Sequence, residues 1–179
     1  MSEIQLRPYR LEDAEVLHEA ILESVREISP WMAWCHPNYS LQEARSWIEL
    51  TLAGREAGTM YDFAIWSDNE YVGACGINQI QPDNRVANLG YWIRSSRAGE
   101  GIAPRAVRWL LDWAMAHTNL NRIEIVAAVE NTRSQRVAEK VNATREAVLA
   151  QRLMANGRPS DAVVYCVLRP DEGQSSSSP

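Results

Sequence analysis

The chain has 179 residues, of which 46% are hydrophobic and 23% are charged, and its formal net charge is −5. This length and composition predict a globular domain with a core of its own, and the lack of a lysine and arginine block argues against a nucleic-acid partner. No apolar run approaches the roughly 20 residues of a membrane helix, and the first residues lack the pattern of a secretion signal, so we expect a cytoplasmic protein with no membrane partner.

The first third of the chain predicts one strand and two helices. Apolar residues at positions 11, 14, 17 and 21 repeat at helical spacing. Ser40 and Glu43 form a capping box, in which each side chain pairs with the other residue's main-chain N–H group. The expected order is a strand at 4–7, a helix from Glu12 to about Ser24, an irregular tryptophan-rich segment at 30–39 and a helix that opens at Ser40 and ends near Gly58.

The middle of the chain predicts an antiparallel meander. Turn residues at 68–69 and 82–84 separate three strand-like segments. The short turns between them favour hairpin connections. The three strands are expected at 61–66, 71–77 and 86–93.

The remainder predicts helices alternating with strands. The expected elements are a helix at 104–117, a strand at 122–129, a short helix at 134–141 and a final strand at 163–168. The order β-α-α-β-β-β-α-β-α-β predicts a mixed α/β fold with a central, mostly antiparallel sheet flanked by helices. We assign residues 1–170 to one domain and expect a disordered tail at 171–179, where four serines occur in a row.

The three cysteines predict neither a disulfide framework nor a zinc site. Cys35, Cys75 and Cys166 are far apart, their number is odd and no CxxC pair occurs. Cys75 and Cys166 lie in apolar, strand-like runs and are therefore expected to be buried thiols. No metal site is predicted.

The segment Gly90–Val107 predicts a strand, a glycine-bearing loop and the first turn of a helix. Such a loop offers unpaired main-chain N–H groups and the positive end of a helix dipole, an arrangement that suits a pyrophosphate. A P-loop would need a Gly-Lys-Ser/Thr sequence, which is absent. A dinucleotide-binding fingerprint would need glycine at position 104, where Pro104 stands, and a βαβ unit rather than a meander before it.

The chain resembles the GNAT N-acetyltransferase superfamily, and specifically its RimJ/RimL-like branch, over about residues 3–170. The family's loop motif, Gln/Arg-x-x-Gly-x-Gly/Ala, falls on residues 98–103, with Ala98 in place of the leading Gln or Arg. The other segments that carry the resemblance are Leu6-Arg7-Pro8, Trp31-Met32 with Trp34, Gly90-Tyr91-Trp92-Ile93, Asn131-Thr132-Arg133-Ser134 and Ser160–Tyr165.

The resemblance implies that the chain binds acetyl-CoA. The main-chain N–H groups of five loop residues would hold its pyrophosphate: Gly99, Glu100, Gly101, Ile102 and Ala103. The edge of the strand at Trp92 and Ile93 would pair with the pantetheine amides like an added β-strand. Asn131 would hydrogen-bond the pantetheine arm, although an asparagine at this point could equally cap a helix.

Acetyl transfer to an amine requires a neutral amine, a stabilised oxyanion and a proton for the leaving thiolate. A backbone N–H at the end of the Trp92 strand could stabilise the oxyanion. Ser134 stands where the family places a hydroxyl near the thioester sulfur, so it is the first candidate general acid, with Tyr165 as the alternative.

The general base is not evident from the sequence. Relatives in this branch can carry a glutamate before the last strand, but the matching position here holds Leu153. Glu130 and Asp161 are the nearest carboxylates along the chain, and His36 is a further candidate. Each of these three also has an ordinary structural interpretation, as a loop, turn or packing residue.

The family resemblance places the acceptor before the second helix, so Trp31, Trp34 and His36 are the expected acceptor contacts. A site without a dedicated base suits α-amines, since their pKa of about 7.7–8.0 leaves more neutral amine than the 10.4 of lysine. We therefore expect direct acetyl transfer to a protein or peptide N-terminal α-amine. The resemblance also implies a homodimer, since relatives often form dimers. A small-molecule amine acceptor, such as an antibiotic or a polyamine, is the alternative, and a non-catalytic acyl-CoA-binding module is the rival from another class.

Overall fold

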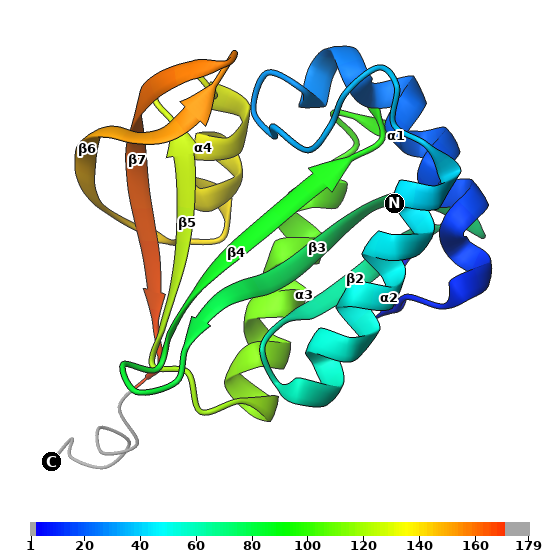
Figure 1. Cartoon of the computed structure of the whole chain (residues 1–179). Coiled ribbons are helices and arrows are strands. Elements are labelled where there is room, and N and C mark those ends of the chain that lie inside the picture. Colours follow the sequence, from blue (N-terminus) through cyan, green and yellow to red (C-terminus); the bar gives the residue numbers. More distant parts are fainter. Residues whose placement is uncertain (1–2, 171–179) are drawn as a thin grey trace, which may run out of the picture.

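The computed structural model describes residues 3–170, and the expected tail at 171–179 lies outside this range. Strand β1 (Ile4–Pro8) is followed by helices α1 (Ala14–Ile28) and α2 (Leu41–Ala57) and by the meander β2 (Tyr61–Ser67), β3 (Glu70–Gln81) and β4 (Val86–Ile93). The chain continues through α3 (Ile102–His117), β5 (Arg122–Ala128), α4 (Thr132–Lys140), β6 (Thr144–Ala155) and β7 (Arg158–Leu168) (Figure 1).

The strands form one seven-stranded sheet in the order β1-β2-β3-β4-β5-β7-β6. Every neighbouring pair is antiparallel except β4 and β5, which run parallel. The predicted mixed α/β class with a mostly antiparallel sheet is therefore confirmed.

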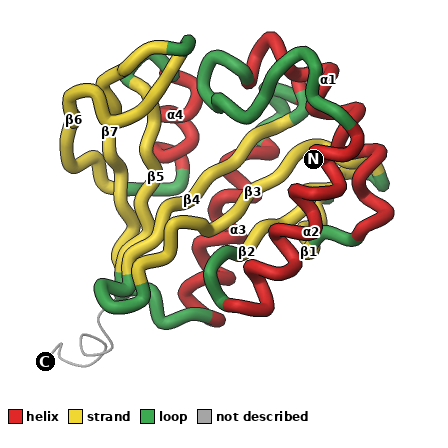
Figure 2. Tube along the Cα trace, viewed as in Figure 1, coloured by secondary structure: helices red, strands yellow, loops and turns green. Residues whose placement is uncertain are grey.

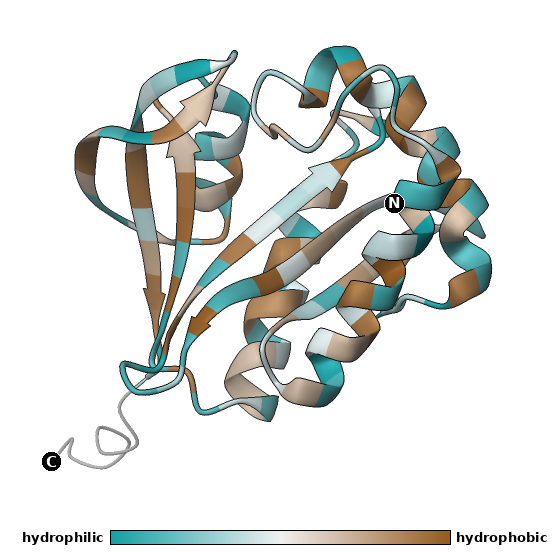
Figure 3. Ribbon diagram, viewed as in Figure 1, coloured by the Kyte–Doolittle hydropathy of each residue, from teal (hydrophilic) through white to brown (hydrophobic). Residues whose placement is uncertain are grey.

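Side chains alternate along each strand, so the sheet presents apolar residues on both of its faces. Helices cover both faces. On one face α3 and α4 bury residues such as Leu110 and Ala138 against Ile65 and Ile123. On the other face α1 and α2 bury an apolar layer against β2 and β3, with Leu17, Ile21, Ile48, Ala64 and Tyr71 among its members. Figure 1 shows α3 and the α1–α2 pair on opposite sides of the strands, and Figure 3 shows apolar and hydrophilic residues alternating along these helices.

Helix α2 begins where the sequence predicts. The main-chain N–H of Glu43 donates to Ser40 Oγ at 3.2 Å, and that of Ser40 donates to Glu43 Oε2 at 2.8 Å. Gly58 ends the helix in the left-handed region, with φ of 69°. These local bonds fix both ends without help from the rest of the fold.

Strand β6 is missing from the predicted order, which contained only one strand after α4. Its sequence, TREAVLAQRLMA, is rich in good helix formers and lacks an apolar alternation. Most of its residues are exposed, and two register shifts interrupt its pairing with β7. Pairing with β7 at the edge of the sheet, rather than local preference, makes this segment a strand.

All three cysteines are free and buried, as expected for Cys75 and Cys166. Within residues 3–170, no helix is long and apolar enough to cross a membrane. The same residues contain no cluster of His, Cys, Asp and Glu side chains that could hold a metal ion.

The two parallel strands separate halfway along their length. Residues 86–88 of β4 pair with residues 122–124 of β5, and no pairing continues beyond them in the described chain. Strand β4 stays paired with β3 as far as Ile93, and β5 stays paired with β7 as far as Ala128. The sheet therefore opens into a wedge between β4 and β5, seen in Figure 2 as two diverging strands.

Candidate active site

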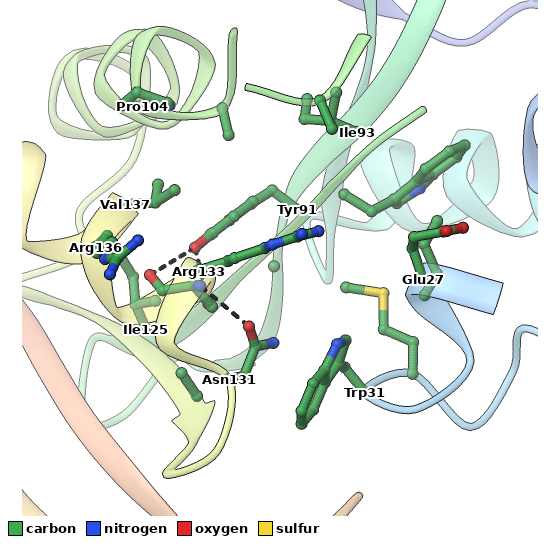
Figure 4. Close-up of a pocket in the computed structure, with 18 of the residues that line it drawn as sticks. Glu27, Trp31, Tyr91, Ile93, Pro104, Ile125, Asn131, Arg133, Arg136 and Val137 are labelled. Carbon is green, nitrogen blue, oxygen red and sulfur yellow. Dashed lines mark hydrogen bonds between the residues drawn. The ribbon is translucent and has the colours of Figure 1, made fainter. Parts of the chain in front are cut away.

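A cavity of about 570 Å³ fills the wedge between β4 and β5. Its walls come from residues 89–93 of β4, residues 125–128 of β5, the loop that leads into α3, and one face of α4. The end of α1 and the segment after it close the other side through Glu27, Trp31 and Met32, with Leu153 of β6 nearby in the lining (Figure 4). Because β4 is not paired with β5 from Leu89 onward, the edge of β4 that faces β5 leaves main-chain groups available for a ligand.

The glycine loop has the conformation that the sequence predicts for an anion site. Gly99 and Gly101 have φ of 89° and 74°, and a Cβ built on either residue meets nothing within 4 Å. Gly101 is the N-cap of α3, whose first N–H groups lack partners within the helix. Open space, free N–H groups and a helix N-terminus together suit a pyrophosphate.

Arg97 holds this loop in place with its guanidinium. Its Nε donates to Glu100 Oε1 at 2.8 Å, and its Nη1 donates to Glu70 Oε2 at 2.6 Å. These hydrogen bonds to Glu100 and Glu70 raise the pKa of Arg97. Because two carboxylates already balance its charge, the main chain rather than Arg97 is left to bind an anion.

The start of the loop is anchored to α1. The main-chain N–H groups of Ser95 and Ser96 donate to Ser24 Oγ and Glu23 Oε1, both at 3.0 Å. Arg94 adds a bond from its Nε to Glu23 Oε2 at 2.6 Å. The segment between β4 and the glycines is therefore fixed by side chains 70 residues away in the chain, which no local pattern indicates.

Two hydroxyl groups meet in the cavity where β4 faces α4. Tyr91 Oη lies 2.8 Å from Ser134 Oγ and also donates to the main-chain oxygen of Ser134 at 3.1 Å. Burial raises the pKa of Tyr91 to about 12, so its phenol stays protonated at neutral pH. Asn131 caps α4, because its Oδ1 accepts from the N–H of Ser134 at 3.1 Å. The capping interpretation of Asn131 therefore holds, and its side-chain NH₂ is left for a ligand.

Helix α4 brings positive charge to the cavity. Arg133, Arg136 and Lys140 all line it, spaced three and four residues apart on one face of the helix. Figure 4 shows Arg136 beside Val137 on the α4 side and Arg133 reaching from this helix across the middle of the view. This wall can neutralise the phosphates of a nucleotide-like ligand.

Of the three expected acceptor residues, one lines the cavity and two lie outside its lining. Trp31 lines the cavity. Trp34 is 43% exposed and packs edge-on against Trp92, with ring centroids 6.3 Å apart, but it is outside the lining. His36 pairs its Nε2 with Glu43 Oε1 at 2.9 Å, at the start of α2 and also outside the lining.

The remaining candidate acids and bases lie outside the cavity. Tyr165 is fully buried on β7 and donates to Glu139 Oε1 at 3.3 Å. Glu130 is exposed in the turn before α4, and Asp161 accepts from the main-chain N–H of Gln151 at 2.9 Å. Leu153 does line the cavity but cannot accept a proton.

The sequence analysis missed three contributions to this site. Tyr91 shares the face of β4 with Leu89 and Ile93, so strand alternation beside the glycine loop could have identified it. The spacing of the α4 cations is also visible in the sequence. Glu27 gave no signal, because only the packing of α1 against the end of β4 brings it to the cavity.

The residues present fit a long, flexible ligand with an anionic head. The glycine loop and α4 suit phosphates, the free edge of β4 suits amide groups, and the Tyr91–Ser134 pair can deliver a proton at the inner end. The separation of β4 from β5 creates room for such a ligand without disturbing the core on either side.

Comparisons with known proteins agree with this chemistry. The family model "Acetyltransferase (GNAT) domain" matches residues 3–144. YdaF of Bacillus subtilis (strain 168), named as a candidate ribosomal N-acetyltransferase, is 31% identical over 173 residues, which cover 93% of this chain and 91% of YdaF.

Two solved structures share the fold over nearly their whole length. Mycobacterium smegmatis RimJ in complex with CoA-disulfide has a TM-score of 0.87 and 30% identity, covering 96% of this chain and 84% of that one. RimL, a ribosomal L7/L12 α-N-protein acetyltransferase in complex with coenzyme A, has a TM-score of 0.87 and 25% identity, covering 92% and 93%. The chain belongs to the GNAT acetyltransferase family and is an N-acetyltransferase that uses acetyl-CoA.

Proposed function

We propose that this enzyme transfers an acetyl group from acetyl-CoA directly to the N-terminal α-amine of a protein or peptide. The observation that carries the proposal is the continuous cavity, which runs from the glycine loop and α4, past Tyr91 and Ser134, to the end of α1. No cysteine is among its described lining residues, so no thiol stands ready to carry the acetyl group. Direct transfer needs both substrates in one cavity, and this one has two distinct ends.

The cofactor end is assigned to the glycine loop, β4 and α4. The main-chain N–H groups of residues 99–103 would hold the pyrophosphate, assisted by the cations of α4. The free edge of β4 at Trp92 and Ile93 would pair with the amides of the pantetheine arm, and the NH₂ group of Asn131 would bind it from the other side. Acetyl-CoA, when bound, supplies a thioester whose acetyl group is open to attack by an amine.

Ser134 Oγ is the proton donor in this proposal. It lies at the N-terminal end of α4 and lines the cavity, while Tyr91 Oη is within hydrogen-bond distance behind it. A proton given up by Ser134 can be replaced by the phenol of Tyr91 once its O–H turns from the main-chain oxygen of Ser134 to Oγ, and solvent then restores the proton of the phenol, whose pKa is raised to about 12 by burial. Tyr165 and Glu130 lie outside the cavity, so the proposal gives them no part in the reaction.

The α-amine is favoured over lysine by the supply of neutral nucleophile. An α-amine with a pKa of about 7.7–8.0 is roughly a tenth neutral at pH 7, whereas lysine with 10.4 is far below that. The activity named for RimL, α-N-protein acetylation of a ribosomal protein, supports the same choice. The proposal includes a cytoplasmic location, because an enzyme that acetylates ribosomal proteins would meet them in the cytoplasm.

The test is release of free thiol from acetyl-CoA with a panel of acceptors. The panel contains octapeptides with a free N-terminal serine, alanine or methionine, the same peptides N-acetylated but carrying an internal lysine, and spermidine. Fastest release with the free N-terminal peptides is expected. Faster release with the lysine peptides or spermidine would overturn the α-amine assignment, and binding of acetyl-CoA with no release in the presence of any amine would favour the non-catalytic acyl-CoA-binding module.

A further inference from the structure

The cavity carries opposite charges at its two ends. Arg133, Arg136 and Lys140 line it from α4, and Arg97, which is already paired with Glu70 and Glu100, lines it from the glycine loop, whereas Glu27 lines it from the last turn of α1. Glu27 is the only carboxylate among the described residues of the lining. Figure 4 places Arg136 and Glu27 on opposite sides of the view, with Tyr91 between them. Since the phosphates of the cofactor require the cationic end, the anionic end faces whatever enters from α1.

The Glu27 carboxylate is held in place but not neutralised. Its Oε2 accepts from Ser95 Oγ at 3.0 Å, and Ser95 is itself fixed by the bond from its N–H to Ser24 Oγ. Among residues 3–170, no salt bridge joins Glu27 to a cation. Glu23, one helical turn earlier, contrasts with it, because its Oε2 pairs with Arg94 at 2.6 Å and it is not part of the lining.

Aromatic side chains border the same end of the cavity. Trp31 and Trp92 both line it, and Figure 4 shows Trp31 on the same side as Glu27. Trp92 is fixed by edge-on and tilted contacts with Trp34 and Tyr71, at 6.3 and 6.0 Å between ring centroids. Indole faces attract a cation, and they attract it most strongly where water is excluded.

We propose that Glu27, together with the indoles of Trp31 and Trp92, binds the amino group of the acceptor, which arrives as an ammonium ion and gives its proton to solvent before it attacks the thioester. The inference rests on the proposed acetyl transfer to an amine and adds the group that recognises it. A carboxylate fixed by Ser95 beside the end of β4 brings the ammonium nitrogen next to the strand edge where the thioester arm is assigned. Glu27 is therefore a specificity-determining residue that touches the acceptor rather than the cofactor.

The test variant is Glu27→Gln, which keeps an oxygen for Ser95 Oγ but loses the negative charge. For an octapeptide with a free N-terminal serine, KM is expected to rise about tenfold or more, as for the loss of a hydrogen bond between charged groups. The kcat and the KM for acetyl-CoA are expected to stay within about threefold of wild type. Glu19→Gln is the matched control, with the same change at an exposed position of the same helix outside the cavity, and should leave the acceptor KM unchanged.

An equilibrium measurement separates charge recognition from catalysis. Calorimetry in the presence of coenzyme A compares the free N-terminal octapeptide with its N-acetylated form. Wild type is expected to bind the cationic form about tenfold more tightly, and Glu27→Gln should bind both alike. The inference is overturned if Glu27→Gln keeps both the full preference for the free N-terminal peptide and the wild-type KM for it. The proposed function still stands in that case, provided that the amine-dependent release of thiol continues. If no amine increases thiol release by wild type, the proposed function fails and this inference fails with it.

Discussion

Tyr91 and Ser134 bring together two hydroxyl groups from elements far apart in the chain. Tyr91 lies on β4 and Ser134 in the first turn of α4, yet their oxygens are 2.8 Å apart. The same phenol also bonds the main-chain oxygen of Ser134, so the serine is fixed in position by one side chain. A proton donor held in this way needs little reorganisation when the thiolate leaves.

Removing either hydroxyl is expected to slow thiol release. Ser134→Ala should lower kcat about 100-fold, and Tyr91→Phe about tenfold, within the range of general acid contributions. The double variant should be no slower than Ser134→Ala alone, because the two groups act as one unit. Steady-state kinetics with acetyl-CoA measure this. Tyr165→Phe is the control, a buried tyrosine bonded to Glu139 of α4 but outside the cavity, and a loss of kcat there would count against the pairing.

Gly101 is required for its backbone conformation and for the space beside it. Its φ of 74° is strained for a β-branched residue, and a Cβ there points into open space at the start of α3. Gly101→Val is therefore expected to weaken coenzyme A binding by at least about tenfold, because the main-chain N–H groups would move and the space for the pyrophosphate would shrink. Isothermal calorimetry with coenzyme A measures the loss.

Gly157 offers a control for backbone strain alone. It has φ of 72°, open space around its Cβ position and a place in the β6–β7 turn, away from the loop. Gly157→Val should cost a similar amount of stability, about 1–2 kcal/mol, without changing coenzyme A affinity. Equal losses of affinity in the two variants would contradict the assignment of the loop.

The β2–β3 pair contains a buried carboxyl group with an unsatisfied oxygen. Asp62 of β2 is 8% exposed, and its Oδ2 has no hydrogen-bond partner among the described residues. Gly76, opposite it on β3, makes room for it, because a Cβ there would lie 2.1 Å from Asp62 Oδ1. Burial raises the pKa of Asp62 to about 7, although the nearby charge of Arg55 opposes this. The pair of strands therefore tolerates the acid form better than the ion.

This shift predicts that stability depends on pH with a definite sign. The folded-state pKa of Asp62, about 7, exceeds the ordinary value of 3.8 for an aspartate. The contribution of protonated Asp62 to the free energy of unfolding is therefore complete below about pH 4, and it is lost as the pH rises to about 7. Asp62→Asn cannot ionise, so relative to wild type it should gain up to about 4 kcal/mol at pH 8 compared with pH 4.

Urea unfolding at both pH values measures the difference between Asp62→Asn and wild type. Asp83→Asn, the same change in the exposed turn after β3, should show no such pH dependence. A constant difference between Asp62→Asn and wild type at the two pH values would show that Asp62 is ionised in the folded protein.

At the scale of the whole molecule, the wedge divides the sheet into two parts that a short stretch of strand pairing joins. Strands β1–β4 carry α1 and α2, while β5–β7 carry α4, and within residues 3–170 the strand pairing between the two parts is limited to residues 86–88 with 122–124. At the open end, the N–H of Asn156 in the β6–β7 turn donates to the main-chain oxygen of Pro30 at 2.7 Å. A ligand in the cavity touches both parts and so adds to these contacts.

Saturating coenzyme A is therefore expected to raise the midpoint of thermal unfolding. At 100 times its Kd the ligand should contribute about 2.7 kcal/mol, since it binds only the folded state. Pantetheine, which lacks the pyrophosphate and the nucleotide, should give a much smaller shift at the same concentration. Differential scanning fluorimetry measures both, and equal shifts would show that the phosphates add nothing at the glycine loop.

Local sequence accounts for much of the fold and for one half of the site. The capping box at Ser40, the turns of the meander and the stripe of α3 depend on residues close in the chain, and each forms where it was expected. The glycine loop belongs to the same class, because its φ values and the start of α3 follow from local sequence. Strand β6 shows the limit, since its composition favours a helix and only pairing with β7 decides otherwise.

The sequence by itself determined the α/β class, the order of all elements but one, and the loop that suits a pyrophosphate. Only the tertiary structure decided that Tyr91 stands behind Ser134, that Trp34 and His36 lie outside the cavity, and that Glu27 lines it. The physical reason is distance along the chain. Helix caps and strand alternation act over a few residues, whereas the contacts of Ser24 with Ser95 and of Tyr91 with Ser134 span 71 and 43 residues. These long-range contacts follow from how the sheet opens between β4 and β5, which no short stretch of sequence records.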